Sequence, residues 1–241
     1  MKKHVPNALT CLNLLCGCLA LSLILAGDAF DNSRLVTAAY LVGLAAVADF
    51  FDGFAARALG VSSPIGKDLD SLADMVSFGV VPGAILYRLL SAGTLSSSTL
   101  PGGNYLPYLA FSLTIFSALR LAKFNNDSRQ ADSFIGLPTP ACTLVVAALP
   151  LILANDKLGL SNYLLTPWFL LGLTAVLSTL LVAEIPLFAL KFKNFGWADN
   201  RRRYVFIVLA AGLVLALGAA GVPLAVLAYV AMSVPAAERA G

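Results

Sequence analysis

Long apolar stretches, separated by short polar breaks, run through the whole chain. A transmembrane α-helix needs about 20 mostly apolar residues, and inside a bilayer only helices or closed barrels satisfy their own backbone hydrogen bonds. The pattern therefore predicts an all-α polytopic membrane helix bundle of about eight transmembrane helices, six in a core and two in a C-terminal pair. The expected spans lie near residues 8–26, 34–57, 66–90, 106–123, 137–154, 164–190, 203–219 and 222–237.

The first apolar stretch and the last two each allow a second interpretation. The last two stretches are short, so a re-entrant hairpin is an alternative to two full spans. At the start, Met1–His4 followed by an apolar run is also typical of a signal peptide, with a cleavage site at Leu25–Gly27. The first run, however, is about long enough to span, and further runs follow it. An uncleaved first helix is the better interpretation.

The composition agrees with a chain that uses lipid as its solvent. Of 241 residues, 59% are hydrophobic and only 12% are charged, whereas soluble domains contain about 25% charged residues. No polar break is long enough for a separate soluble domain. We expect one membrane domain over residues 1–241, with a core at 4–191 and the C-terminal helical pair at 203–237. Its surroundings are the lipid bilayer, and we expect no nucleic acid partner.

Lysine and arginine are distributed unevenly between the two sides that alternating spans create. If the N-terminus is cytoplasmic, 13 of the 16 basic residues fall on the inner side and only Arg34, Arg88 and Lys157 on the outer side. Cytoplasmic loops of membrane proteins carry such an excess. The asymmetry predicts an integral protein of the inner, or cytoplasmic, membrane whose N-terminus faces the cytoplasm.

Five of the 13 acidic residues lie between positions 49 and 74, within predicted spans. A carboxylate at membrane depth is costly and indicates function. Asp49 and Asp52 share a helix face at the inner end of the second span, and Asp70 and Asp74 share one at the start of the third. The short connection at Gly60–Pro64 lets the four acids converge on the cytoplasmic side. Four carboxylates at close range need cations to stay ionised, and an all-oxygen set suits Mg²⁺ or Mn²⁺.

These acids belong to a longer motif with small and basic residues. It reads D-x2-D-G-x2-A-R-x8-G-x3-D-x3-D, beginning at Asp49 and ending at Asp74. The string resembles the signature of the CDP-alcohol phosphotransferases at every fixed position. The resemblance implies an enzyme with two divalent ions, Mg²⁺ or Mn²⁺, and a CDP-linked donor. It implies metal ligands at Asp49, Asp52, Asp70 and Asp74, of which Asp70 and Asp74 are catalytic and Asp74 is the base toward the acceptor hydroxyl. A cation-coupled transporter using the same acids is the alternative from a different class.

Residues beside the acids are candidates for holding the nucleotide and its diphosphate. Gly53 and Ala56 leave room for a nucleotide close to the helix backbone, and Arg57 offers a planar positive fork for phosphate. In the first helix, Asn7 follows Pro6 and is alternatively a helix cap. The predicted nucleotide and diphosphate site comprises Asn7, Thr10, Asn13, Gly53, Ala56, Arg57 and Gly66.

Segments outside the signature indicate the acceptor. The stretches 4–17, 71–82, 118–125 and 136–140 resemble the family members that use L-serine. The resemblance then implies transfer of a phosphatidyl group from CDP-diacylglycerol to L-serine, giving phosphatidylserine and CMP. Other acceptors used within the family, such as glycerol 3-phosphate, inositol phosphate or choline, stay open as alternatives.

Two basic residues near the inner end of the fourth span are the candidates for binding the acceptor. Arg120 and Lys123 lie one helical turn apart at the level of the aspartates, where they would hold phosphate or the carboxylate of serine. Alternatively, both are interfacial anchors whose long side chains reach the membrane surface. Family members are often dimers, so the resemblance also allows a homodimer, although no residue pattern marks its surface.

Overall fold

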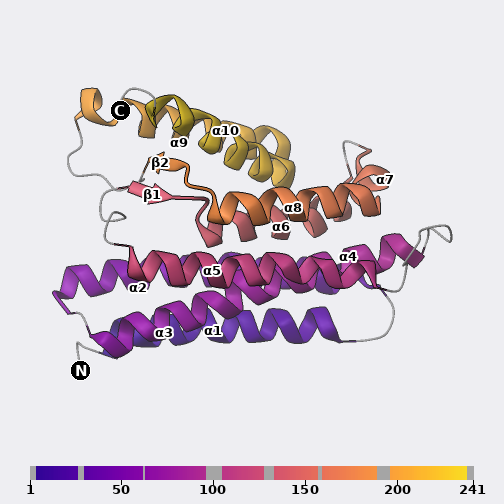
Figure 1. Cartoon of the computed structure of the whole chain (residues 1–241), viewed down its shortest axis with the longest axis horizontal. Coiled ribbons are helices and arrows are strands. Elements are labelled where there is room, and N and C mark those ends of the chain that lie inside the picture. The colour runs from indigo at the N-terminus through magenta and orange to yellow at the C-terminus, as the bar shows by residue number, and fades with distance from the viewer. Residues whose placement is uncertain are drawn as a thin grey trace.

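The computed structural model describes residues 4–26, 30–61, 63–95, 105–127, 133–156, 159–188 and 196–237. Helices dominate these residues and run side by side along the long axis of the molecule (Figure 1). In chain order the elements are α1 (His4–Leu25), α2 (Asn32–Leu59), α3 (Pro64–Asp74), the π-helix η1 (Met75–Val80), α4 (Val81–Leu95), the 3₁₀-helix η2 (Leu106–Phe111), α5 (Ser112–Asn126), β1 (Ser133–Ile135), α6 (Thr139–Ala154), α7 (Ser161–Leu164), α8 (Pro167–Val182), β2 (Pro186–Phe188), α9 (Trp197–Leu217), the 3₁₀-helix η4 (Gly218–Ala220) and α10 (Gly221–Ala237).

The predicted class, an all-α polytopic membrane bundle, is confirmed. Each of the eight predicted apolar stretches contains a helix of the described structure. Four helical runs are long and apolar enough to cross a bilayer, and α6 and α8 are shorter apolar helices. The four long runs are His4–Leu25, Asn32–Leu59, Pro64–Thr94 and Asn200–Ser233.

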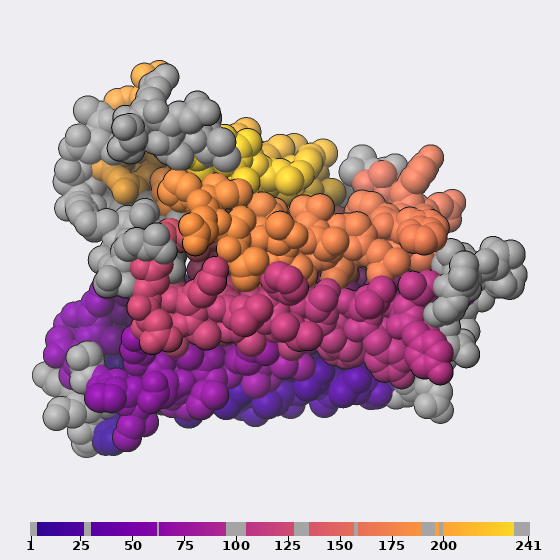
Figure 2. Space-filling model, viewed as in Figure 1, coloured from indigo at the N-terminus to yellow at the C-terminus, as the bar shows by residue number. Residues whose placement is uncertain are grey.

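The last of these runs folds back on itself at Gly218. This glycine has a positive φ of 59° at the end of α9, a backbone conformation that residues with a Cβ rarely adopt. As a result α9 and α10 pack against each other as a pair. The pair lies at one edge of the bundle and the N-terminal helices at the opposite edge (Figure 2).

The polar ends of the helices gather at the two ends of the bundle. The N-terminus, the α2–α3 connection, the β1–β2 ribbon and the C-terminus lie at the same end, and α7 lies at the other (Figure 1). Helix α1 packs on α2, α2 on α6, and α5 on α8. This order brings together those halves of α1, α2, α3 and α5 that lie toward the α2–α3 connection.

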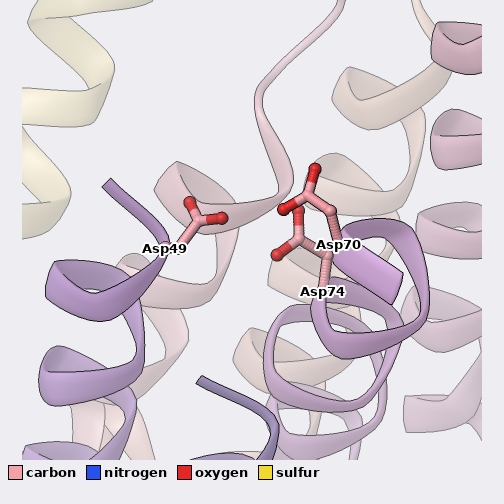
Figure 3. Close-up of side chains that lie close together, drawn as sticks. All are labelled: Asp49, Asp70 and Asp74. Atoms are coloured by element: carbon pink, nitrogen blue, oxygen red, sulfur yellow. The ribbon is translucent and has the colours of Figure 1, made fainter. Parts of the chain in front are cut away.

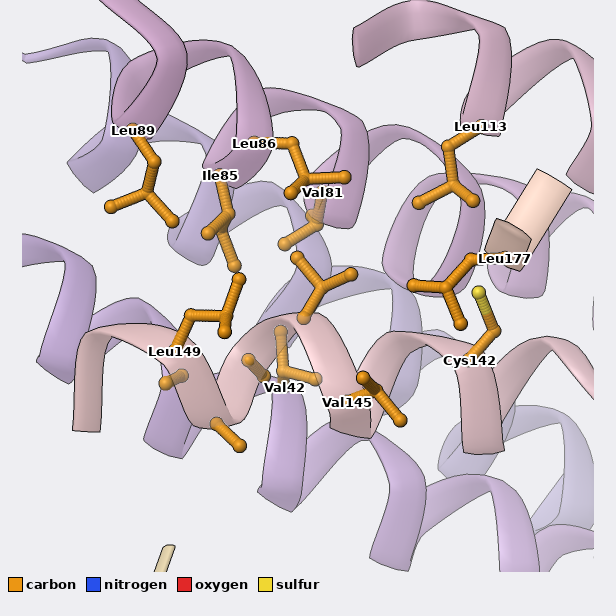
Figure 4. Packing of buried hydrophobic residues seen from close by; sticks show 14 of the residues in the cluster. Val42, Val81, Ile85, Leu86, Leu89, Leu113, Cys142, Val145, Leu149 and Leu177 are labelled. Carbon is orange, nitrogen blue, oxygen red and sulfur yellow. The ribbon is translucent and has the colours of Figure 1, made fainter. Parts of the chain in front are cut away.

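Small and branched apolar side chains fill the interior. Val81, Ile85 and Leu89 of α4 face Val145 and Leu149 of α6 across the centre of the bundle (Figure 4). In a bilayer the hydrophobic effect adds little between helices, so association depends on close packing and favours small residues at contacts. The buried face of α2 toward its neighbours follows this rule, with Leu35, Ala38, Ala39, Val42, Ala45 and Ala48.

One predicted span differs from the structure. The stretch 164–190 was expected to be helical throughout, but α8 ends at Val182 and residues 186–188 form strand β2, paired antiparallel with β1. Pro186 disfavours helical geometry in the residue before it. The Leu180 and Ile185 carbonyls instead accept hydrogen bonds from the backbone N–H groups of Leu137 and Gly136, at 2.8 and 3.0 Å.

The third span is not a uniform α-helix, because the π-helix η1 begins directly after Asp74. A π-turn widens the helix, and such turns occur mostly at functional sites. Two hydroxyl groups bond to its carbonyls. Thr143 Oγ1 in α6 donates to Phe78 O at 2.8 Å, and Thr114 Oγ1 in α5 donates to Gly79 O at 2.9 Å. These bonds tie the widened turn to the two neighbouring helices.

Candidate active site

The connection between α2 and α3 brings their acidic residues together. Helix α2 ends at Gly60, which has a φ of 62° and donates its N–H to the carbonyls of the last turn. Ser63 then caps α3, accepting a hydrogen bond from Gly66 N at 3.0 Å, and Pro64 occupies the first turn. Proline in the first turn and serine at the cap are the usual start of a helix. The chain therefore reverses within a few residues.

Three carboxylates meet where the two helices face each other. Asp49 of α2 and Asp70 and Asp74 of α3 offer oxygens that all lie within 4.8 Å of one another (Figure 3). Within the described part of the chain, no ion pair reaches them. Like charges this close are unfavourable without a cation between them. A compact all-oxygen donor set is what Mg²⁺ and Mn²⁺ prefer, so these residues fit a divalent ion.

Asp52 takes a different position from the other three acids. Its side chain is only 6% exposed and lies outside the group of three. It accepts a hydrogen bond from Thr10 Oγ1 at 2.6 Å, and this threonine also bonds to Pro6 O at 3.1 Å. A neighbouring hydroxyl can hold the carboxylate in one orientation. The hydrogen bond to α1 thus fixes Asp52 apart from the other three carboxylates.

Helix α1 makes a second contact with the acids through Asn13. Its Nδ2 donates to Asp74 Oδ1 at 3.2 Å, and its side chain is fully buried. The Asn13 Oδ1 atom has no hydrogen-bond partner within the described residues. A buried carbonyl oxygen without a partner is unfavourable, and it offers one more oxygen ligand beside the carboxylates.

A cavity of about 270 Å³ lies between α1, α2 and α3, beside the connection that joins α2 to α3. It lies beside the acid cluster, since Asp52 and Asp70 form part of its wall. Gly66 keeps the cavity open, because a Cβ at this position would lie only 3.2 Å from Asn7 Oδ1. The lining residues are Pro6, Asn7, Thr10, Asp52, Gly53, Ala56, Val61, Ser63, Gly66, Lys67 and Asp70.

The structure brings most of the predicted nucleotide residues to this cavity. Five of the seven line it, namely Asn7, Thr10, Gly53, Ala56 and Gly66. Arg57 is exposed, and its guanidinium lies over Gly53, where an added Cβ would come within 3.3 Å of Nη1. Asn13 lies away from the cavity wall, against Asp74.

Two polar residues of the cavity wall, Ser63 and Lys67, lie outside the predicted site. Ser63 caps α3. Lys67 Nζ donates to Asn125 O at 3.2 Å, and Asn125 Nδ2 donates to Ser71 Oγ at 2.8 Å. These bonds join α3 to the end of α5. The position of Lys67, directly after Gly66 of the motif, was the available signal.

The two predicted acceptor residues lie in different surroundings. Arg120 is 6% exposed, with its guanidinium carbon 5.4 Å from the Phe124 ring centroid, and its Nε has no hydrogen-bond partner within the described chain. Arg120 and Asp74 are close enough to interact electrostatically. Lys123 is exposed at the end of α5. Only the arginine is therefore directed into the protein beside the acids.

The fold and this site agree with one family of membrane enzymes. The model of the CDP-alcohol phosphatidyltransferase family matches residues 3–183, from α1 to the end of α8. This range contains the acid cluster, the cavity and Arg120. The chain belongs to the CDP-alcohol phosphatidyltransferase family.

Several relatives carry the name CDP-diacylglycerol–serine O-phosphatidyltransferase. The Bacillus subtilis protein is 35% identical over 163 residues, which cover 66% of this chain and 84% of that protein. The Mycobacterium leprae protein is 31% identical over 190 residues, covering 76% of this chain and 57% of that protein. The Methanocaldococcus jannaschii protein is 32% identical over 142 residues, covering 59% and 58%. The similarity thus extends to bacterial and archaeal proteins that carry this name.

Proposed function

We propose that this protein transfers the phosphatidyl group of CDP-diacylglycerol to the hydroxyl of L-serine, giving phosphatidylserine and CMP. The observation that carries the proposal is the meeting of Asp49, Asp70 and Asp74 beside a cavity in the inner half of a membrane bundle. The family membership and the names of the relatives support this choice of donor and acceptor. A cation-coupled transporter would not need a nucleotide-sized cavity at this place.

In this proposal the aspartates hold two divalent ions, Mg²⁺ or Mn²⁺. Asp49, Asp70 and Asp74 supply the close set of oxygens, and Asp52 supplies a further carboxylate from the cavity wall. When bound, the ions would neutralise charge on the diphosphate and on the leaving phosphate. The Thr10 and Asn13 side chains of α1 keep two of the carboxylates in fixed orientations.

The donor would place its nucleotide in the cavity and its acyl chains in the bilayer. Gly53, Ala56 and Gly66 provide the space, while Asn7 and Lys67 provide polar contacts. Arg57 would reach the phosphates from the rim. The α2 side chains Phe50, Phe51 and Phe54 are all about half exposed or more on the helix that carries Asp49 and Asp52, and they offer an apolar surface for acyl chains.

The acceptor would bind between Arg120 and Asp74. Serine carries a carboxylate, and Arg120 is a buried cation with an unused donor beside the site. Asp74 would take the proton of the serine hydroxyl as its oxygen bonds to the phosphorus of the phosphatidyl group. The bond from that phosphorus to the bridging oxygen breaks, and CMP leaves with the electron pair. Lys123, exposed on the next turn, would attract the carboxylate of the acceptor or anchor the helix.

The orientation and assembly are also proposals. We infer a cytoplasmic membrane location with the N-terminus and the cavity facing the cytoplasm. In support, the seven basic residues Arg57, Lys67, Arg120, Lys123, Arg201, Arg202 and Arg203 belong to the inner side of the predicted topology. That side corresponds to the end of the bundle that holds the α2–α3 connection (Figure 1). A homodimer is the assembly that the family resemblance suggests.

An acceptor panel tests the proposed function. Purified protein would be incubated with CDP-diacylglycerol, Mn²⁺ and, in separate samples, L-serine, glycerol 3-phosphate, inositol phosphate or choline. We expect CMP and a new phospholipid only with L-serine. Consumption of glycerol 3-phosphate instead of serine would contradict the acceptor assignment and leave the family assignment intact. No CMP with any acceptor would favour a non-enzymatic role.

A further inference from the structure

The C-terminal helix α10 lies beyond residues 3–183, which the family match covers, yet one of its side chains reaches the interior. Tyr229 is only 6% exposed and belongs to the same buried cluster as Cys142 and Leu181. By contrast, large apolar side chains such as Leu224 and Leu227 on the same helix are exposed on the surface of the protein. Tyr229 is therefore a specific contact between the C-terminal pair and the core.

The contacts of Tyr229 centre on strand β2. Its Oη donates a hydrogen bond to Phe188 O at 2.8 Å. Its ring packs edge-on against the Phe188 ring, with centroids 4.9 Å apart, and against Phe206 of α9 at 5.4 Å. Strand β2 pairs with β1, which lies between α5 and α6 in the chain. Through these contacts, Tyr229 holds the ribbon that follows the end of α5.

Arg120 lies on α5, one helical turn before the exposed Lys123, and is buried. The Tyr229 hydroxyl is close enough to Arg120 for the two groups to interact electrostatically. Asp74 lies within the same electrostatic range of Arg120. A buried guanidinium with an unused N–H favours an anionic partner strongly, because little water competes for it. Tyr229 therefore belongs to the buried surroundings of Arg120, with its hydroxyl held by Phe188 O. Asp74 is the carboxylate near the same guanidinium.

We propose that Tyr229 is a positioning residue for the acceptor, holding the β1–β2 ribbon and the wall beside Arg120 so that Arg120 faces the Asp74 side of the site. The inference rests on the proposed function. It extends the acceptor site beyond the helices matched by the family to the C-terminal pair. The chemical class that it serves is an acceptor alcohol bearing a carboxylate.

The test compares Tyr229→Phe with the wild type and with Leu227→Ala, a control on the same helix whose side chain is 59% exposed. Tyr229→Phe keeps the ring and removes the hydroxyl. We expect the serine KM to rise about 3- to 10-fold, as for the loss of one neutral hydrogen bond. The KM for CDP-diacylglycerol should stay within a factor of two. Tyr229→Ala should raise the serine KM further, and Leu227→Ala should leave both constants unchanged.

Each outcome decides one of the two claims. If the wild type forms no phosphatidylserine, the proposed function fails, and the inference fails with it. If the wild type is active but Tyr229→Phe has the wild-type serine KM, the inference alone is wrong. It is also wrong if Tyr229→Phe lowers kcat and thermal stability together without a selective change in the serine KM, since that is the signature of a packing role.

Discussion

At the scale of single residues, the neighbours of each aspartate give it a separate part in the site. Asp49, Asp70 and Asp74 share one space, whereas Asp52 is bonded to Thr10 and faces the cavity. Identical side chains in one motif can thus differ in role according to the partner that each finds. The sequence motif alone predicts their convergence but cannot separate these surroundings.

Asparagine substitutions test the carboxylate cluster. Asp70→Asn and Asp74→Asn keep the shape of the side chain but remove the charge that holds cations and, at Asp74, the base. We expect turnover to fall by at least about 100-fold, with normal insertion into the membrane. Asp68→Asn is the matched control, because Asp68 is exposed on the same helix. The rates would be read from CMP release, and comparable losses in all three variants would contradict the account.

Arg120 and Lys123 provide a test of the acceptor site with a built-in control. Arg120→Ala removes a buried cation beside Asp74 and should raise the serine KM about 30- to 150-fold, the equivalent of about 2–3 kcal/mol for a charged hydrogen bond. The KM for CDP-diacylglycerol should change far less. Lys123→Ala removes an exposed charge one turn away and should have a small effect. Unaltered serine kinetics in Arg120→Ala would make this arginine an anchor only.

At the scale of elements, the π-helix η1 connects the acid cluster to the rest of the bundle. It starts immediately after Asp74, and hydroxyls from α5 and α6 bond to its carbonyls. Ser77 Oγ within it donates to Asn13 O of α1 at 3.0 Å. Gly17 allows this close approach, because a Cβ at that position would collide with Ser77 Oγ. The direction of Asp74 therefore depends on three neighbouring helices.

Removal of one of these hydroxyls should disturb the acid cluster from a distance. Thr143→Val keeps the size of the side chain and leaves the Phe78 carbonyl without its bond from α6. We expect a loss of about 0.5–2 kcal/mol in stability and a lower kcat, seen by thermal unfolding in detergent and by CMP release. Thr174→Val is the control, because the buried Thr174 hydroxyl bonds to Leu170 O of its own helix at 2.7 Å and, among the described residues, to no other helix. Equal effects of the two substitutions would contradict a special role for η1.

The sequence predicted the positions of the helices well, but it did not predict where a π-turn or a strand interrupts them. Apolar runs and the Gly60–Pro64 connection mark the helices, because membrane helices leave a strong compositional signal. The last break was predicted between residues 219 and 222, close to Gly218, where α9 ends. The π-turn after Asp74 and the strand at Pro186–Phe188 depend on hydroxyls and carbonyls from distant helices, which no local pattern contains. For the same reason the motif predicted that four acids converge, whereas the structure groups three of them and bonds Asp52 to Thr10 outside that group. The interior position of Tyr229 beside Arg120 likewise needed the tertiary structure.

At the scale of the whole molecule, the proposed orientation makes the cavity face the cytoplasm. Ile65 at the start of α3 is 75% exposed and Tyr163 at the opposite end is 72% exposed. In a background with the exposed Cys11 and Cys18 replaced by alanine, we expect a membrane-impermeant maleimide to label Tyr163→Cys in intact cells. Ile65→Cys should react only after the membrane is opened. The reverse pattern would overturn the orientation.

The central claim is that the carboxylate cluster uses divalent cations to drive phosphatidyl transfer to serine. The most direct measurement follows CMP and phosphatidylserine in the same sample, with purified wild-type protein, CDP-diacylglycerol and L-serine. The account predicts no product in excess EDTA, and equal amounts of CMP and phosphatidylserine once Mn²⁺ or Mg²⁺ is restored. Full turnover in EDTA, or CMP released without phosphatidylserine, would contradict it.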